Sequence, residues 1–551
     1  MSRKATSDLW WKNAVIYCLD VETFFDSDGD GWGDLAGLTE RVDYLGGLGV
    51  SCLWLMPFYP SPHRDDGYDI VDFYGVDERL GTLGDLVELV RTARDRGIRV
   101  IADFVVNHSS DQHPWFRSAC ESRDSPYRDF YVWHDKKPDE KPGDVVFPDR
   151  EDSNWAYNKQ ARQWYLHRFY SHQPDLNIAN PRVRDEIAQI MGFWLDLGLS
   201  GFRIDAVPFL IEPVGLPKDA IADPHEFLRH LRAYLNRRNG EAILLGEVNL
   251  PAEQQRTFFG DEDGDELHML FDFLGNQALY LSLARGDPEP LRKTLAAAPA
   301  IPPTTSLARF VRNHDELTLD QLSEDERGEV FARFGPDPSL QLYGRGLRRR
   351  LPPMLEGDPA ALRMVYSLAF SLPGAAVLFY GEEIGMGENL AIEGRMAVRS
   401  PMQWSAEAHG GFSQAEDPAD LCRPVTAGAF GPEHVNAAAL RRDPDSLLNW
   451  FERLIRRRRE SPEIGFGTLT LLDVDDAPSV LAHRCDWEGS TIVAVHELAG
   501  QAVQVALPVD DGDALVDLFS ADEHPLPATL ALERYAARWF RVRREGQRLP
   551  P

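Results

Sequence analysis

Residues 201–205 (GFRID) set a cation two residues before a carboxylate. On a β-strand, residues i and i+2 point to the same face, so Arg203 would lie beside Asp205. A neighbouring guanidinium favours the ionised form of a carboxyl group at neutral pH. An ionised, oriented carboxylate can attack a sugar carbon as a nucleophile. Taken alone, the pattern fits a structural Arg–Asp pair at a strand end equally well.

Two further carboxylates, Glu247 and Asp315, stand at or just after the ends of other predicted strands. His108 and His314 each follow an asparagine at similar positions. In a closed parallel barrel all strand C-termini meet at one rim, so these side chains would converge although they are far apart in the sequence. A single histidine after a strand is more often an ordinary loop residue. Two Asn-His pairs together with three carboxylates indicate a catalytic site.

Eight short runs rich in apolar and β-branched residues alternate with helical patterns. This alternation predicts parallel strands joined by helices, and eight such units predict an α/β fold, the (β/α)8 TIM barrel. Helices are predicted between the strands, for example at 83–96, 183–197 and 224–236. The predicted strands are residues 14–17, 52–55, 99–106, 201–205, 242–247, 268–271, 307–312 and 376–380.

Two segments depart from this alternation. Residues 108–178 are rich in aromatic and charged side chains, which predicts an inserted B subdomain after the third strand. Residues 464–551 contain short alternating runs separated by Asp/Gly turns, which predicts a C-terminal antiparallel β-sandwich domain. The catalytic barrel would then comprise residues 1–107 and 179–463.

The composition argues against several classes of partner. The formal net charge of −30 disfavours nucleic acid and anionic membranes, and favours a neutral or cationic substrate. No segment has the apolar length of a signal peptide at the N-terminus or of a membrane span. The five cysteines are scattered and form no CxxC pair, which fits a reducing compartment. We therefore expect a cytoplasmic protein, and the sequence leaves open whether it forms a homo-oligomer.

The chain resembles the α-amylase family of retaining glycoside hydrolases and transglycosidases. The blocks that carry this resemblance occur in family order at 103–108 (DFVVNH), 201–205 (GFRID), 245–248 (LGEV) and 310–315 (FVRNHD). A further block, 173–177 (QPDLN), resembles the branch that contains oligo-1,6-glucosidases, α-glucosidases and trehalose synthases.

The resemblance assigns a role to each rim residue. Asp205 would be the nucleophile and Glu247 the general acid/base. Asp315 would bind the O2 and O3 hydroxyls of the sugar, with His108 and His314 at the same ring. A retaining mechanism needs two carboxyl groups about 5–5.5 Å apart. Repulsion from the two neighbouring anions should raise the pKa of Glu247, so that it starts protonated.

Two more blocks, 65–70 (DDGYDI) and 399–404 (RSPMQW), resemble family motifs that bear on substrate size. By this resemblance Tyr68 stacks on the sugar ring at the cleavage subsite. Asp65 and Arg399 would grip the non-reducing-end glucose, as their equivalents do in exo-acting relatives. An ion pair between them would close the pocket to internal segments of a polysaccharide. A simple salt bridge at the rim is the alternative.

An acidic loop at 26–34 (DSDGDGWGD) carries carboxylates at alternating positions. It opens like an EF-hand, but the twelfth position is Gly37 where an EF-hand has a glutamate. The family resemblance implies one structural Ca²⁺ here, and hard oxygen ligands suit that ion. An acidic turn without metal is the alternative, and no organic cofactor is expected. The implied ligands are Asp26, Asp28, Asp30, Asp34 and the carbonyl of Trp32.

Within the family the chain most resembles trehalose synthases, which interconvert maltose and trehalose. We therefore expect an exo-type enzyme that acts on small α-glucosides, such as maltose or trehalose, through a glucosyl-enzyme intermediate. An α-glucosidase that hydrolyses short α-1,4-glucosides is the alternative, and a non-catalytic sugar- or protein-binding homologue is a remote one.

Two features depart from the pattern of trehalose synthases. Residues 247–251 read EVNLP where trehalose synthases carry EANQW, and Asp20 and Glu22 replace a histidine and an arginine of the first strand.

Overall fold

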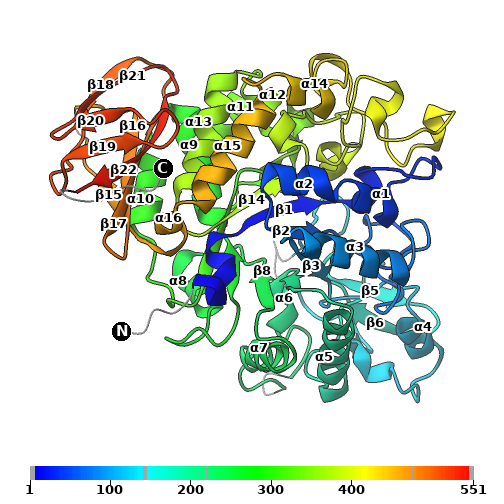
Figure 1. The fold of residues 1–551 in the computed structure, drawn as a ribbon. Coiled ribbons are helices and arrows are strands. Elements are labelled where there is room, and N and C mark those ends of the chain that lie inside the picture. The colour runs from blue at the N-terminus through cyan, green and yellow to red at the C-terminus, as the bar shows by residue number, and fades with distance from the viewer. Residues whose placement is uncertain (1–5, 141–144, 218–219, 475, 545–551) are drawn as a thin grey trace.

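The computed structural model describes residues 6–140, 145–217, 220–474 and 476–544. Eight parallel strands close into a barrel in the order β1-β14-β10-β9-β8-β7-β3-β2 (Figure 1). The predicted TIM barrel is therefore confirmed. The barrel strands are β1 Val15–Leu19, β2 Cys52–Leu55, β3 Arg99–Phe104, β7 Gly201–Ile204, β8 Ile243–Gly246, β9 Met269–Phe271, β10 Ser306–Phe310 and β14 Ala375–Phe379.

The barrel strands are buried on both faces, which explains why they read as continuous apolar runs in the sequence. Every residue of β1, β7, β8 and β14 is buried. The register aligns the strand ends, because Ile204 pairs with Phe104 on one side and with Gly246 on the other. The polar residues that follow these strands therefore start from the same level of one rim.

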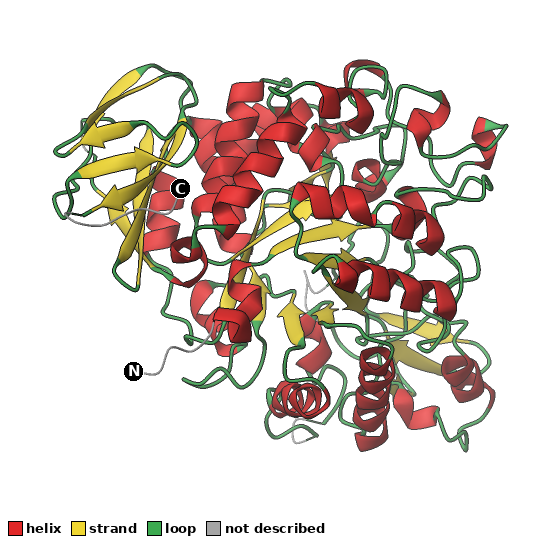
Figure 2. Ribbon diagram, in the orientation of Figure 1, coloured by secondary structure: helices red, strands yellow, loops and turns green. Residues whose placement is uncertain are grey.

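Helices cover the outside of the barrel (Figure 2). In α3 the apolar side chains of Leu86, Leu89 and Ala93 face the core, and a capping box between Thr82 and Asp85 fixes its start. The helices around the barrel are α1 Leu35–Glu40, α2 Val42–Leu48, α3 Leu83–Asp95, α5 Pro181–Asp196, α6 Val207–Ile211, α7 Glu226–Arg238, α8 Ala252–Thr257, α9 Phe273–Arg285, α10 Glu289–Ala296, α11 Glu324–Phe334, α12 Leu351–Met354, α13 Pro359–Ser371, α14 Ala437–Arg442, α15 Leu447–Arg459 and α16 Pro462–Phe466.

The long connection between β3 and β7 forms a small unit of its own. It contains α4 Pro114–Glu121 and an antiparallel sheet of β4 Trp133–His134, β6 Gln163–Leu166 and β5 Trp155–Asn158. Phe116 packs against Tyr131, Trp133 and Tyr165, which explains the aromatic composition of this segment. A second small sheet, β11 Leu317–Thr318, β13 Gly346–Leu347 and β12 Gln341–Leu342, follows β10.

The C-terminal part of the chain is antiparallel. A six-stranded sheet has the order β15-β16-β17-β22-β19-β20, and β18 pairs with β21. This part lies beside α13, where Ser367 accepts a hydrogen bond from Trp539 Nε1 at 2.9 Å (Figure 1). Its strands are β15 Thr468–Leu472, β16 Val480–Trp487, β17 Ser490–Glu497, β18 Val503–Ala506, β19 Ala514–Asp517, β20 Glu523–Pro525, β21 Thr529–Leu532 and β22 Ala537–Arg543.

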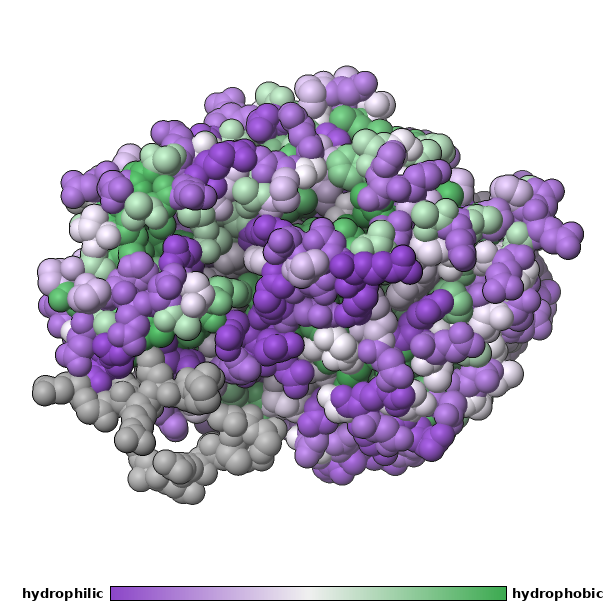
Figure 3. All heavy atoms as spheres, turned by 45° about the horizontal axis from the view of Figure 1, so that its top comes forward, coloured by the Kyte–Doolittle hydropathy of each residue, from purple (hydrophilic) through white to green (hydrophobic). Residues whose placement is uncertain are grey.

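The surface is consistent with the charged composition. Figure 3 shows a largely hydrophilic face with hydrophobic residues in small patches. Among the described residues, no helix is both long enough and apolar enough to cross a membrane.

Candidate active site

Arg203 lies at the centre of the carboxylates at the C-terminal rim of the barrel. Its Nη1 donates to Asp103 Oδ1 and to Asp205 Oδ1, each at 2.6 Å, and its Nη2 donates to Glu247 Oε2 at 2.7 Å. The neighbouring strands β3, β7 and β8 bring these three acids together. The structure thus places Arg203 beside Asp205, as the i, i+2 spacing predicts. Through Arg203 the carboxyl groups of Asp205 and Glu247 are also linked to each other.

The ionisation of the two acids depends mainly on burial. Burial raises the pKa of Asp205 to about 6, the guanidinium of Arg203 opposes the rise, and Asp103 and Asp315 add to it. Arg203 therefore limits the upward shift in the pKa of Asp205 that burial produces. Burial is also the largest cause of the raised pKa of Glu247, ahead of the repulsion from Asp205 and Asp315. At pH 7 Asp205 is mostly ionised.

A second group of polar side chains lies next to these acids. The Tyr68 hydroxyl donates to Asp103 Oδ2 at 3.1 Å and lies 2.8 Å from His314 Nε2. His314 Nε2 is also 3.0 Å from Asp315 Oδ2, and its ring stacks against the ring of Tyr68. His108 Nε2 lies 3.1 Å from the carbonyl oxygen of Tyr68. Burial lowers the pKa of His108 to about 4, so its imidazole is neutral and donates this bond.

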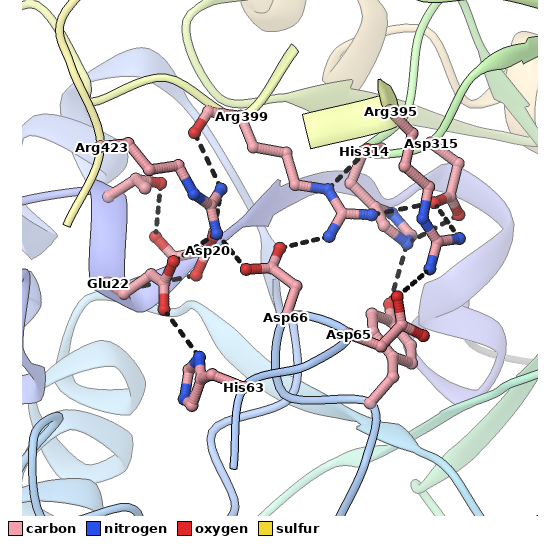
Figure 4. A network of polar contacts seen from close by, with 12 residues as sticks. Asp20, Glu22, His63, Asp65, Asp66, His314, Asp315, Arg395, Arg399 and Arg423 are labelled. Carbon is pink, nitrogen blue, oxygen red and sulfur yellow. Dashed lines mark hydrogen bonds and ion pairs between the residues drawn. The ribbon is translucent and has the colours of Figure 1, made fainter. Parts of the chain in front are cut away.

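The ion pair expected between Asp65 and Arg399 does not form. Asp65 Oδ1 instead binds Arg395 Nη2 at 2.6 Å, and Arg395 Nη1 binds Asp315 Oδ1 at 2.8 Å (Figure 4). Arg399 Nη1 binds Asp66, while its Nη2 is 2.9 Å from Asp315 Oδ1. The reason is geometric: Arg395 lies between Asp65 and Asp315 and occupies the place predicted for Arg399.

Arg395 and Asp66 are the site residues that sequence reasoning missed. Both lie close to residues that it singled out, since Asp66 follows Asp65 and Arg395 precedes Arg399 by four positions. The adjacent aspartates and the nearby arginines were therefore visible in the sequence, but the sequence does not indicate which aspartate pairs with which arginine. Gln173 Nε2 further holds Asp65 Oδ2 at 2.9 Å.

A cavity of about 690 Å³ lies over these residues. Glu247, Asp315 and Arg395 contribute polar groups to its wall. Aromatic side chains line it as well, among them Phe169 from the long β3–β7 connection and Phe209 from α6. A few charged groups beside aromatic rings suit a small molecule with hydroxyl groups and apolar faces, such as a sugar. Arg395, which bridges Asp65 and Asp315, forms part of the cavity wall.

The acidic loop near the N-terminus brings three of its carboxylates together. Oxygens of Asp26, Asp28 and Asp34 lie within 4.8 Å of one another. Asp30 is outside this group and accepts a hydrogen bond from the backbone nitrogen of Trp32 at 2.8 Å. Burial raises the pKa of Asp28, and the neighbouring acids add to the rise. Three clustered hard oxygen donors fit a Ca²⁺ or Mg²⁺ ion.

Comparisons with known proteins agree with this geometry. The family model of the alpha amylase catalytic domain matches residues 19–327 and 350–467. The chain is 40% identical to a trehalose synthase/amylase of Mycolicibacterium smegmatis, over 98% of this chain and 93% of that protein. It is 42% identical to a trehalose synthase of Thermus thermophilus over 94% of this chain, although it spans only about half (53%) of that relative's length.

More distant relatives also match almost the whole chain. An oligo-1,6-glucosidase of Halalkalibacterium halodurans is 28% identical over 97% of this chain and 99% of that protein. The crystal structure of a trehalulose synthase mutant in complex with Tris superposes with a TM-score of 0.79 at 28% identity, covering 97% of this chain and 100% of the other.

Proposed function

Because the chain belongs to the α-amylase family, we propose that it is a retaining, exo-type α-glucoside enzyme that interconverts maltose and trehalose, with hydrolysis as a side reaction. One observation carries the proposal: a single guanidinium, Arg203, binds both Asp205 and Glu247. The two carboxyl groups are therefore held together on one guanidinium, and Glu247 also lines the cavity, an arrangement that suits a nucleophile and an acid acting on the same glycosidic bond.

The two acids divide the reaction between them. Asp205 attacks the anomeric carbon while Glu247 gives a proton to the glycosidic oxygen, which leaves with its sugar. The product of this step is a β-glucosyl ester on Asp205. Because the ester has no charge, the repulsion from Asp205, which adds to the raised pKa of Glu247, is lost, and Glu247 can take a proton from the incoming acceptor. Attack by that acceptor releases the glucosyl group with its original configuration.

The exo preference rests on Arg395. This arginine lies in the wall of the cavity and bridges Asp65 and Asp315, so a glucose unit with a further sugar on its non-reducing side would meet the ion pairs. Small α-glucosides with a free non-reducing end fit this arrangement.

The acceptor decides whether the enzyme isomerises or hydrolyses. If the released glucose stays in the cavity, it can attack the ester, and if water reaches the ester first, the sugar is hydrolysed. The similarity to proteins named trehalose synthases favours isomerisation. The second candidate, an α-glucosidase, is favoured by residues 248–251, which depart from the trehalose synthase pattern. There Asn249 Nδ2 donates to Asp320 Oδ1 at 2.8 Å, and Leu250 lines the cavity.

Product analysis separates these candidates. Incubated with maltose, the protein is expected to form trehalose together with a smaller amount of glucose, and chromatography that resolves the three sugars would measure both. Heat-inactivated protein is the control. Glucose as the only product would establish the α-glucosidase reading. Binding without turnover of any member of a broad α-glucoside panel would leave the non-catalytic homologue.

The acidic loop is proposed to hold Ca²⁺ through Asp26, Asp28 and Asp34. Removal of divalent ions with EGTA should lower Tm by a few degrees, and added Ca²⁺ should restore it, because an ion that binds only the folded state stabilises that state. Differential scanning calorimetry measures the shift. Asp28→Asn should remove the dependence on Ca²⁺. Equal Tm values in EGTA and in Ca²⁺ for the unaltered protein would contradict a metal in this loop.

A cytoplasmic location completes the proposal. All five cysteines carry free thiols, and four of them are buried. This usage suits a reducing compartment. Fractionation of producing cells, with the protein found among the cytoplasmic proteins, tests the location.

A further inference from the structure

A buried cluster of charges lies behind the sugar-binding carboxylate, where the first strand departs from the family pattern. Asp20 and Glu22, which replace a histidine and an arginine, follow β1 and are buried. Arg423 reaches both of them and also binds Asp66. Figure 4 shows these residues as one network that continues to the active site. The charged and titratable members of the network are Asp20, Glu22, His63, Asp65, Asp66, His314, Asp315, Arg395, Arg399 and Arg423.

Asp66 joins the two halves of this network. Its Oδ2 binds Arg399 Nη1 and its Oδ1 binds Arg423 Nη2. Arg423 Nη1 also donates to the carbonyl oxygen of Arg399 at 2.9 Å. On its other side, Arg399 Nη2 lies 2.9 Å from Asp315 Oδ1. A continuous line of ion pairs therefore runs from Arg423 through Asp66 and Arg399 to Asp315.

The backbone conformation of Asp66 indicates that its side chain has a specific role. Its φ is +54°, in the left-handed region that favours glycine. A residue with a β-carbon adopts this conformation at a cost in free energy, and the cost is smaller for aspartate than for most residues. The side chain is only 5% exposed and bonds to two guanidinium groups. Those bonds offset the cost of the conformation.

The cluster is an ion-pair network already supplied with positive charge. Ligand atoms of Glu22, His63 and Asp66 lie within 4.8 Å of one another, a spacing that could suit a metal ion. Arg423 Nη2, however, contacts both Glu22 and Asp66, so its guanidinium supplies the positive charge that a metal ion would otherwise provide. Burial would raise the pKa of Asp66, but Arg423 and Arg399 outweigh it and hold the pKa below its ordinary value. Burial raises the pKa of Glu22 to about 7, so Asp66 is the firmly ionised member.

We propose that Asp66, held in place by Arg423, is a positioning residue that fixes the guanidinium of Arg399 against Asp315. The carboxylate that binds the hydroxyls of the glucosyl ring is thereby fixed as well. The inference rests on the proposed function, because it takes Asp315 as a sugar ligand. A ligand displaced by even a fraction of an ångström loses transition-state contacts, so positioning affects turnover more than it affects stability.

Asp66→Asn tests this role with little change in shape. Asparagine also tolerates the left-handed conformation, and its amide oxygen accepts one of the two arginine bonds. We expect kcat/KM for maltose to fall at least about tenfold. The loss of a negative charge should also move the acid limb of the kcat/KM profile to lower pH, since fewer anions then oppose the ionisation of Asp205.

Arg423→Gln provides the opposite change in charge. Removing this cation should move the acid limb to higher pH, with a smaller loss of kcat/KM because Asp66 still holds Arg399 directly. Shifts of opposite sign cannot arise from lost stability, which both variants would share. If Asp66→Asn does not fold, the upward shift in Arg423→Gln supports the proposal and its absence overturns it.

Asp517→Asn is the matched control, because Asp517 is a buried aspartate whose Oδ2 binds Arg538 Nε at 2.5 Å in the C-terminal sheet. It should lower Tm and leave kcat/KM and its pH profile unchanged. Unchanged kinetics in Asp66→Asn, with a Tm loss like that of the control, would show that Asp66 only stabilises the fold. An unaltered protein without turnover of any α-glucoside would instead contradict the proposed function.

Discussion

Replacing Asp205 with alanine is expected to lower kcat for maltose by at least about ten-thousand-fold, the size of loss seen when a covalent nucleophile is removed. Without this carboxylate no glucosyl ester can form, so isomerisation and hydrolysis should be lost together. Glucose and trehalose released from maltose would be quantified by chromatography after long incubation. An undiminished rate would refute the assignment of Asp205 as the nucleophile.

The variant should still fold, because Arg203 keeps two of its three carboxylate partners, Asp103 and Glu247. Equal or nearly equal Tm values would confirm this. Azide gives a sharper readout: a small anion that enters the space left by Asp205 can attack the anomeric carbon and displace the leaving group. The product would be β-glucosyl azide, with the configuration inverted, and NMR would identify it. If azide gives no such product while the fold is intact, the missing group is not the nucleophile.

The barrel and its three rim acids could be predicted because they rest on local features. Each barrel strand is a short apolar run buried on both faces, and Asp205 and Glu247 directly follow two such runs at β7 and β8. Parallel strands place such residues on one rim regardless of the loops between them. Asp315 reaches the same region from the end of β10.

The pairing of charges at the edge of the site could not be predicted in this way. Asp65 and Asp66 are neighbours, and Arg395 and Arg399 are four positions apart, yet Asp65 pairs with Arg395 instead of the expected Arg399, and Arg399 pairs with Asp66. The choice depends on where the backbone aims each side chain across more than 300 residues of sequence separation. The left-handed conformation of Asp66 turns its carboxylate toward Arg399 and Arg423, and no motif reports that.

The effect of burial on the pKa of Asp205 could not be predicted from the sequence either. The spacing of Arg203 and Asp205 predicted a stabilised anion, and the contact forms at 2.6 Å. The pKa of Asp205 nevertheless rises to about 6, because the loss of water outweighs one guanidinium that is shared among three carboxylates. Burial is likewise the main reason why the pKa of Glu247 is raised.

Replacing Glu247 with glutamine is expected to lower kcat for maltose by about 10²–10⁴-fold, the usual contribution of a general acid. For an aryl α-glucoside, whose leaving group departs without a proton, the rate of ester formation should fall far less.

The pH profile gives a second readout. Asp205 acts as the anion, so kcat/KM of the unaltered protein should fall as the pH drops through about 6. Glu247 acts as the acid, so kcat/KM should also fall as the pH rises through its raised pKa.

In Glu247→Gln the limb at high pH should disappear and the limb at low pH should remain, because only the second belongs to the nucleophile. The amide oxygen can still accept the bonds that Glu247 Oε2 takes from Arg203 and from the Ala206 nitrogen, so the fold should be kept. Glu266→Gln is the matched control, since Glu266 is buried, accepts a hydrogen bond from Arg229 Nη1 at 3.0 Å, and is not among the residues that line the cavity. This variant should retain both limbs of the pH profile, and its rate should fall by the same small factor for every leaving group. If Glu247→Gln showed that same uniform loss, with both limbs intact, the proton would have to come from another group in the cavity.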